Sequence, residues 1–269
     1  MTLQGLQYFG ARGDDTARAV RDLGCKVCRV QLFTDHDDAA LVSNETAATI
    51  DNEVLNAGMM PYVIIRTPEQ VSQVPPGHWI EFYNEPDLEQ FNMPLSQFKE
   101  RYMTIVEACA GRNPLAIGGV SNLNDRGMRF LKQLEWDKIP PEVACSHHWY
   151  PDDDRPHESH IETGFLHKKR NTRDQDIADL KAIVGERPLV NSETGFWDGP
   201  FRTESDVAEW YRVERHFWER QGYAIVIAYQ LDSEAPPSDP NQWGPQHGYG
   251  LRRVGTVSDW KPSADAWFA

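Results

Sequence analysis

Two glutamates occupy positions from which a pair of carboxyl groups can do acid–base and nucleophilic chemistry. Glu85 ends the apolar run that begins at Trp79, and Glu193 ends the run that begins at Pro188. Two carboxyl groups flanking a glycosidic bond cleave it with retention at about 5–5.5 Å separation and with inversion at roughly 6.5–9.5 Å. Pro86 biases Glu85 away from the helical conformation, which suits a carboxylate that leaves a strand. The pair indicates a glycoside-cleaving site if the fold brings both run ends together.

The elements that must position these glutamates alternate between short apolar runs and amphipathic segments. The predicted strands cover residues 3–9, 26–33, 60–66, 79–84, 115–120, 143–150, 188–192 and 224–231. The predicted helices cover residues 15–23, 43–57, 96–110, 125–136, 174–184 and 204–221, with a closing helix from 262. Strict alternation of strand and helix is typical of a parallel sheet. Eight units within 269 residues predict an α/β fold, a single (β/α)8 TIM barrel that forms one domain over residues 1–269.

The barrel explains how distant run ends can meet. The carboxyl ends of all eight strands lie on the face that carries the active site. Glu85 ends the fourth predicted strand and Glu193 the seventh, so their side chains can face each other across the barrel opening. No Gly-x-Gly-x-x-Gly follows the first strand, which argues against a dinucleotide-binding fold.

The charge balance excludes some partners. A net charge of −14 repels phosphate backbones and anionic lipid, so we expect no nucleic-acid partner and no membrane partner. No apolar run has the length of a transmembrane span. A neutral oligo- or polysaccharide is compatible with this surface, and we expect a monomer that needs no cofactor. Residues 1–5 show no signal-peptide pattern, which leaves the cytoplasm, or secretion if the chain begins at its mature end.

The spacing of Cys25 and Cys28 is that of a zinc or redox motif. We expect neither function, because residues three apart on one strand point to opposite faces, and the chain has no second cysteine pair at zinc spacing. These cysteines, with Cys109 and Cys145, are predicted to be small buried apolar side chains.

The motifs at the strand ends resemble glycoside hydrolase clan A, the retaining barrels with one catalytic glutamate after strand four and one after strand seven. The resemblance is carried by Ile-Glu-Phe-Tyr-Asn-Glu-Pro-Asp at 80–87, Ser-His-His-Trp-Tyr-Pro at 146–151 and Val-Asn-Ser-Glu-Thr-Gly at 190–195. Residues 23–30 and 250–262 are similar to the second strand and the closing segment of the clan, so the resemblance spans nearly the whole chain.

This resemblance implies roles for three residues. Glu85 would protonate the leaving oxygen and then deprotonate the attacking water, while Glu193 would attack the anomeric carbon. Asn84 would hydrogen-bond the 2-hydroxyl of the sugar, a contact that strengthens in the transition state.

The resemblance also implies a supporting shell. Arg29 would keep Glu193 ionised, since a nearby cation lowers a carboxylate pKa. Tyr150 would donate to Glu193, and His148 would line the site beside Glu85. Arg29 has an alternative partner in Glu81, which strand alternation also points inward. A metal pair of His147 and His148 is disfavoured, because adjacent strand residues face opposite ways.

Aromatic residues on the late loops and two departures from the clan pattern bear on the substrate. Trp197 and Trp243, on the loops after strands seven and eight, are candidate sugar platforms. Clan members usually place a Trp at the end of strand eight, where this chain has Tyr229 and Gln230; both are candidate substrate-binding residues. Arg66 ends strand three where cellulase-like members often have a His, which favours xylosidase-like or exopolysaccharide-cleaving branches.

Three functions are compatible with the sequence. The first is a retaining β-glycoside hydrolase, an endo-acting β-glycanase that cleaves a plant or microbial polysaccharide, with an exo-β-glycosidase of xylosidase or glucosidase type as the alternative within the same chemistry. The second is a non-catalytic carbohydrate-binding barrel, which would lack one of the two glutamates. The third is a metal-dependent barrel hydrolase, which would need His-x-His at the end of strand one; the chain has Tyr8-Phe9-Gly10 there.

Overall fold

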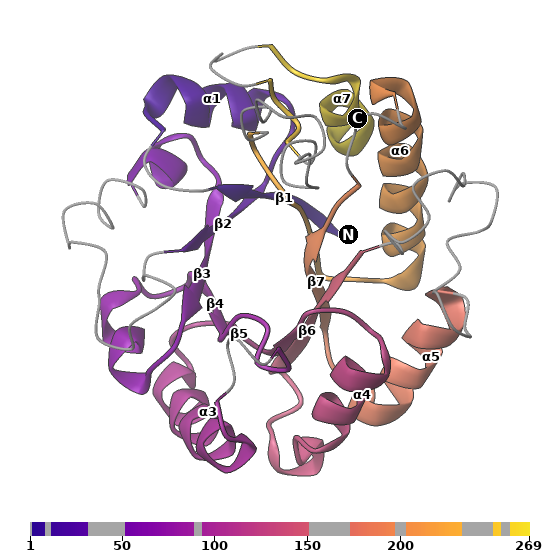
Figure 1. Cartoon of the computed structure of the whole chain (residues 1–269). Coiled ribbons are helices and arrows are strands. Elements are labelled where there is room, and N and C mark those ends of the chain that lie inside the picture. Colours follow the sequence, from indigo (N-terminus) through magenta and orange to yellow (C-terminus); the bar gives the residue numbers. More distant parts are fainter. Residues whose placement is uncertain are drawn as a thin grey trace, which may run out of the picture.

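Eight parallel strands close into a barrel in chain order, which confirms the predicted (β/α)8 fold. The computed structural model describes residues 2–8, 12–31, 52–88, 93–150, 173–196, 203–232, 250–253 and 259–269. The strands are β1 (Leu3–Tyr8), β2 (Val27–Gln31), β3 (Met60–Ile65), β4 (Trp79–Phe82), β5 (Leu115–Val120), β6 (Ala144–Trp149), β7 (Leu189–Thr194) and β8 (Ile225–Ala228). Figure 1 shows them as an inner ring surrounded by helices.

The helices follow the strands as the alternating pattern predicts. They are α1 (Asp14–Asp22), η1 (Pro68–Gln73), α3 (Leu95–Cys109), α4 (Asp125–Lys132), η3 (Trp136–Lys138), α5 (Arg173–Val184), α6 (Glu204–Gln221) and α7 (Pro262–Phe268). Of the helix predicted over 43–57, residues 52–56 are helical and residues 43–51 lie outside the described part. Among the described helices α6 is the longest; it begins at a capping box between Thr203 and Asp206 and ends at Gly222 in the left-handed conformation.

Two strand boundaries differ from the prediction and matter for the site. β7 runs to Thr194, so Glu193 lies within the strand and not after it. β8 ends at Ala228, so Tyr229 and Gln230 follow the strand. The β7 error arises because a polar residue in the chain reads as the end of an apolar run although its backbone still pairs with the neighbouring strand. The β8 error is the opposite one, since the apolar run in the sequence continues past the last residue of the strand.

The inward side chains of the barrel change from apolar to polar along the strands. An apolar cluster fills the amino-terminal half of the interior and consists of Val27, Tyr62, Ala116, Ala144, Val190, Ile225 and Ile227. Two residues further along their strands, the inward positions carry Arg29 after Val27 and Ser146 after Ala144, and both are buried. A second, larger apolar layer packs between the strands and the helices. The amino-terminal half of the barrel interior is therefore apolar, and a buried polar layer follows toward the carboxyl ends of the strands.

Two strands carry an extra residue near their carboxyl ends. In β5, Ile117 and Val120 pair with Cys145 and His147 of β6, so three steps on β5 match two on β6. In β7, Asn191 and Glu193 pair with His147 and His148, which leaves Ser192 as the extra residue. Bulges of this kind re-aim the side chains that follow them.

The cysteines are buried, as predicted, but the predicted orientation of two of them is wrong. Cys25 precedes β2 rather than lying on it, and both Cys25 and Cys28 pack in the layer between strands and helices. A hydrogen bond with Cys25, together with burial, raises the pKa of the Cys28 thiol. The alternation rule fails here because it applies only to residues within one strand.

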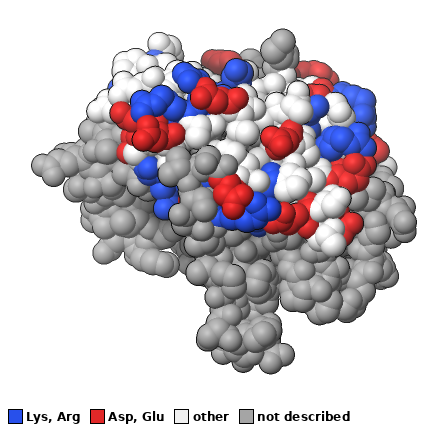
Figure 2. All heavy atoms as spheres, turned by 90° about the horizontal axis from the view of Figure 1, so that it is seen from above, with Lys and Arg blue, Asp and Glu red and all other residues white. Residues whose placement is uncertain are grey.

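The surface carries charges of both signs. Figure 2 shows acidic and basic side chains interspersed among the described residues on one side of the barrel. Within the described part of the chain, every helix is too short or too polar to cross a membrane.

Gly118 in the β5 bulge offers a test of this packing. It has φ 119°, and a Cβ at this position would lie 2.6 Å from the carbonyl oxygen of Ser146. We expect Gly118→Ala to lower the unfolding free energy by about 1–2 kcal/mol for the backbone conformation and about 1–3 kcal/mol more for the clash. Thermal denaturation measures this, at roughly 2–4 °C per kcal/mol.

The matched control is Gly185→Ala. Gly185 also has a positive φ, 73°, but a Cβ there meets nothing within 4 Å. The Gly185→Ala variant should therefore show the conformational cost alone. Equal losses of unfolding free energy in the two variants would contradict a tightly packed β5–β6 contact.

Candidate active site

The bulge in β7 decides where Glu193 points. Val190 faces the barrel interior, so regular alternation would turn Ser192 inward and Glu193 outward. Because Ser192 is an extra residue in the pairing with β6, Glu193 is set opposite His148 and shares its inward face. Glu193 is almost fully buried, with 11% of its side chain exposed.

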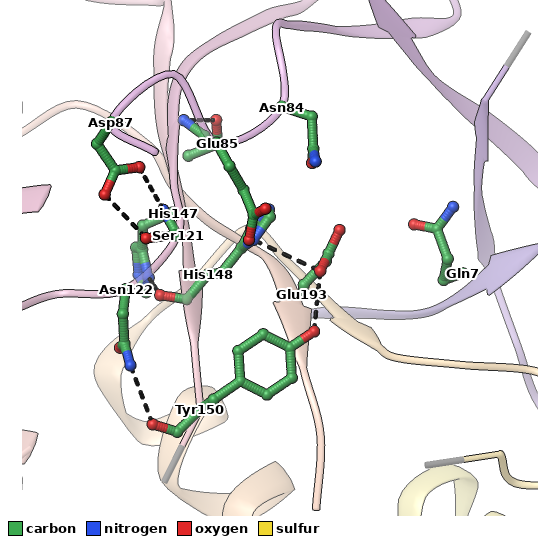
Figure 3. Close-up of polar contacts among 12 residues, drawn as sticks. Gln7, Asn84, Glu85, Asp87, Ser121, Asn122, His147, His148, Tyr150 and Glu193 are labelled. Atoms are coloured by element: carbon green, nitrogen blue, oxygen red, sulfur yellow. Dashed lines mark hydrogen bonds and ion pairs between the residues drawn. The ribbon is translucent and has the colours of Figure 1, made fainter. Parts of the chain in front are cut away.

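Glu193 is held by three groups. Arg29 forms an ion pair with its Oε1. The Tyr150 hydroxyl donates to its Oε2 at 2.8 Å, and His148 Nδ1 lies 3.5 Å from the same oxygen (both contacts in Figure 3). Burial raises the pKa of Glu193, but the charges of His148 and Arg29 and the Tyr150 hydrogen bond outweigh it, so the net pKa is lowered. Glu193 is therefore a carboxylate at neutral pH.

Glu85 reaches the site from an irregular turn after β4. Tyr83 and Glu85 have φ values of 69° and 50°, and the Glu85 amide donates to the carbonyl of Gly119 at 2.8 Å. Glu85 thus avoids the right-handed helix before Pro86, as predicted, but it is left-handed and not extended. The turn places the carboxyl group at the rim, where 19% of the side chain is exposed.

The two carboxyl groups are close. One ligand atom each from Glu85, His148 and Glu193 all lie within 4.8 Å of one another. A closest approach of at most 4.8 Å between their oxygens is compatible with the short carboxyl spacing associated with retention.

His148 lies between both glutamates. Its Nδ1 is 3.1 Å from Glu85 Oε1 and 3.5 Å from Glu193 Oε2. Burial lowers the pKa of His148, but the charge of Glu193 and the hydrogen bond and charge of Glu85 outweigh it, so the net pKa is raised. His147 faces the other way, where burial lowers its pKa to about 3 and its Nε2 contacts the Tyr223 hydroxyl at 2.7 Å. The two histidines do face opposite sides of β6, as predicted.

Arg29 connects most of the site. Its Nε donates to Glu81 Oε2 at 2.8 Å, its Nη1 to Gln7 Oε1 at 2.8 Å, and its Nη2 to Asn84 Oδ1 at 2.7 Å. Glu81 and Glu193 were alternative partners at the level of sequence, and the structure shows both at once. Gln7 was missed; the signal for it was its inward register on β1, beside Arg29 on β2.

A second polar cluster supports the turn that carries Glu85. Asp87 accepts from the Ser121 amide and hydroxyl, both at 2.8 Å, and from Arg126 at 3.2 Å. Asn122 donates to the carbonyl of Tyr150 at 3.2 Å (Figure 3). These contacts join the loops after β4, β5 and β6, and sequence patterns missed them because they link separate strand ends.

The aromatic candidates are only partly placed. The Tyr229 ring lies edge-on to Tyr150, with centroids 6.3 Å apart, so it borders the site. Gln230 follows a cis peptide bond and is buried, and its carbonyl accepts from the Leu251 amide. Trp197 and Trp243 lie outside the described residues.

Glu85, His148 and Glu193 are also the group, among the described residues, whose atoms lie near enough to hold a metal ion. Glu193 already accepts from Arg29 and Tyr150, and the Arg29 cation beside it opposes a second positive charge. The arrangement therefore favours acid–base and nucleophilic chemistry by the carboxyl groups over metal binding.

Comparison with known proteins places the fold. No family model matches the chain, and no curated protein matches it. Its structure is similar to a family 39 glycoside hydrolase from Bacteroides cellulosilyticus WH2, with a TM-score of 0.66 and 15% identity over 98% of this chain and 62% of that one. It is also similar to an exo-β-1,4-mannosidase from Opitutaceae bacterium strain TAV5, with a TM-score of 0.71 and 10% identity over 99% of this chain and 58% of that one. For cellulose synthase subunit Z from Clostridioides difficile, the TM-score is 0.64 and the identity 13%, over the full length of both chains.

These comparisons show a shared barrel. This chain spans about three fifths of the family 39 enzyme and of the mannosidase, and the whole of the Clostridioides protein. Identities this low carry the fold only, so the chemistry must be argued from the site itself.

The Tyr150 hydrogen bond gives a test that needs no substrate. Tyr150→Phe removes a donor to the ionised form of Glu193, so we expect the pKa of Glu193 to rise. Because the folded-state pKa is depressed, Glu193 contributes stability above its unfolded-state pKa, and the variant should lose part of it there. Carbon-13 NMR of labelled glutamate carboxyls, with Glu193 assigned from Glu193→Gln, measures the titration.

Tyr102→Phe is the control, since Tyr102 is buried against Phe98 on α3 and away from the site. An unchanged Glu193 titration in Tyr150→Phe would show that the hydroxyl does not support the carboxylate.

Proposed function

We propose that this chain is a retaining β-glycoside hydrolase of the clan A type, with Glu193 as nucleophile and Glu85 as acid/base. The observation that carries the proposal is the close pair of carboxyl groups in unlike surroundings. Glu193 is buried and contacts the Arg29 cation and the Tyr150 hydroxyl. Glu85 lies at the rim and, of the residues Arg29, Tyr150 and His148, contacts His148. Carboxyl groups in unlike environments can take different roles in one reaction.

In the first step, a Glu193 oxygen bonds to the anomeric carbon as the glycosidic bond breaks, and Glu85 gives its proton to the leaving oxygen. In the second step, Glu85 takes a proton from water, the water oxygen bonds to the anomeric carbon, and the bond to Glu193 breaks. Two inversions give net retention, and Glu85 returns to its protonated state.

The neighbouring residues suit these steps. Asn84 uses its side-chain oxygen to accept from Arg29, which leaves its amide NH2 to donate to a sugar hydroxyl. Arg29 and Tyr150 stabilise the departing Glu193 carboxylate in the second step. His148 contacts both glutamates and can balance their charge as protons move.

For the substrate, we propose a neutral oligo- or polysaccharide, with endo action as the first candidate and exo action as the second. Proteins with this fold include a xyloglucan-specific endo-β-1,4-glucanase and the exo-β-1,4-mannosidase, so the fold accommodates both. A non-catalytic binding barrel fits less well, since such a protein has no need for two facing carboxyl groups supported by Arg29 and Tyr150.

Glutamine variants test the assignment on 4-nitrophenyl β-glycosides and on β-glucan, xylan, mannan and galactan. We expect Glu193→Gln to lower kcat by about 10⁴–10⁶-fold, because no covalent intermediate can form. Glu85→Gln should lower kcat by about 10²–10⁴-fold on polysaccharide and less on nitrophenyl glycosides, whose leaving group departs without a proton.

Glu214→Gln is the matched control, since Glu214 is a fully buried glutamate paired with Arg173 outside the barrel interior. Proton NMR of the first product should show the β-anomer. An α-anomeric first product would rule out retention, and equal activity in wild type and Glu193→Gln on every active substrate would remove Glu193 from the reaction.

A further inference from the structure

Glu81 is a charged side chain sealed inside the barrel that none of the reaction steps uses. It lies on β4, its side chain is 0% exposed, and its Oε2 receives Arg29 Nε at 2.8 Å and Nη2 at 2.7 Å. A carboxylate buried this deeply needs a compensating charge, and Arg29 supplies it. The pair adjoins the site, because Arg29 also forms an ion pair with Glu193.

The contact fixes the direction of the Arg29 guanidinium. A guanidinium is a planar fork with five N–H donors, so holding one edge sets the aim of the others. Glu81 holds the Nε and Nη2 edge. The remaining donors then point from Nη1 to Glu193 and Gln7, and from Nη2 to Asn84.

The contact also divides the charge of Arg29. The buried Arg29 cation lies between two carboxylates, Glu81 and Glu193. Because Glu81 already offsets part of the positive charge, Arg29 attracts Glu193 less strongly than an unpaired cation would. The other ionisable groups facing Glu193 are His148 and Tyr150 from the β6 side and Glu85 from the turn after β4. Tyr62, on β3, interacts with the Glu81–Arg29 pair. Interactions between these buried charges are weakly screened.

We propose that Glu81 is a positioning residue that sets both the aim and the effective charge of Arg29, so that Arg29 keeps Glu193 ionised without making it a poor nucleophile. The role of Glu193 as nucleophile in this statement rests on the proposed function. The charge and geometry of the Glu81–Arg29–Glu193 chain are independent of the proposed function.

Two substitutions separate aim from charge. Glu81→Gln keeps the length of the side chain and an oxygen acceptor but removes the charge, so Arg29 acts on Glu193 as a full cation. Glu81→Asp keeps the charge but draws the carboxylate back from the guanidinium, so the aim of Arg29 is lost. Glu214→Gln, which removes the charge from another buried Arg–Glu pair, is the matched control for general effects of burial.

The first measurement is the carbon-13 NMR titration of the Glu193 carboxyl, which needs no substrate. We expect Glu81→Gln to move the Glu193 midpoint to lower pH, because a carboxylate beside an unshared cation is harder to protonate. We expect no downward shift in Glu81→Asp or Glu214→Gln. A titration in Glu81→Gln identical to wild type would overturn the proposal.

The second measurement is steady-state kinetics on the most active nitrophenyl β-glycoside, with folding checked by circular dichroism. We expect kcat to fall about 10–100-fold in Glu81→Gln and Glu81→Asp with KM little changed, as for a misplaced or weakened reacting group. The acid limb of the pH profile should move to lower pH in Glu81→Gln only. If Glu81→Gln does not fold, Glu81→Asp decides: wild-type kcat in that variant overturns the proposal.

The two measurements also separate this inference from the proposed function. A shifted titration in a protein inactive on all glycosides supports the charge role and refutes the glycosidase. Glycosidase activity that is unchanged in both Glu81 variants supports the glycosidase and refutes the role of Glu81.

Discussion

The buried Arg29 guanidinium is the group on which the rest of the site depends. It is 1% exposed, and its donors are met by two carboxylates and two side-chain amides from β1, β4, β7 and the turn after β4. A cation removed from water is tolerated only when paired and hydrogen-bonded on nearly every donor. Four segments that are distant in sequence must therefore converge at one depth of the barrel, and a cluster of buried apolar residues fills the interior beneath them.

Local irregularities aim the two glutamates at the space above Arg29. Regular strand geometry would leave Glu193 facing the helices, and the extra residue at Ser192 reverses it. β4 ends at Phe82, before Glu85 is reached. The left-handed conformations of Tyr83 and Glu85 then turn the chain so that Glu85 lies at the rim of the barrel. Non-glycine residues in this region cost about 1–3 kcal/mol each and persist when surrounding contacts enforce them. The Glu85 amide bond to Gly119 and the Asp87 cluster are such contacts.

The same arrangement gives the two glutamates unlike surroundings. Glu193 is enclosed and paired with a cation, so it stays ionised. Glu85 stands more exposed and touches His148, whose other neighbour is Glu193. The proposed distinction between a nucleophile and a proton carrier therefore rests on depth in the barrel and not on residue type, since both residues are glutamates.

Patterns along the chain were enough to predict the eight strands, their order and the two glutamates, together with Arg29, Asn84, His148 and Tyr150, which the structure places around them. Apolar runs, alternation and helix stops are properties of neighbouring residues, and the barrel turns strand ends into a common face. The same patterns misplaced the end of β7, turned Cys25 and Cys28 apart, and left Gln7 and the Asp87–Ser121 contact unseen. Each of these depends on a partner strand or loop: a bulge exists only relative to the register of β6, and a buried ion pair only where β2 and β4 face the same interior. Spacing could not decide whether Arg29 pairs with Glu81 or with Glu193, because the direction of Glu193 depends on the bulge in β7. In the closed barrel Arg29 pairs with both.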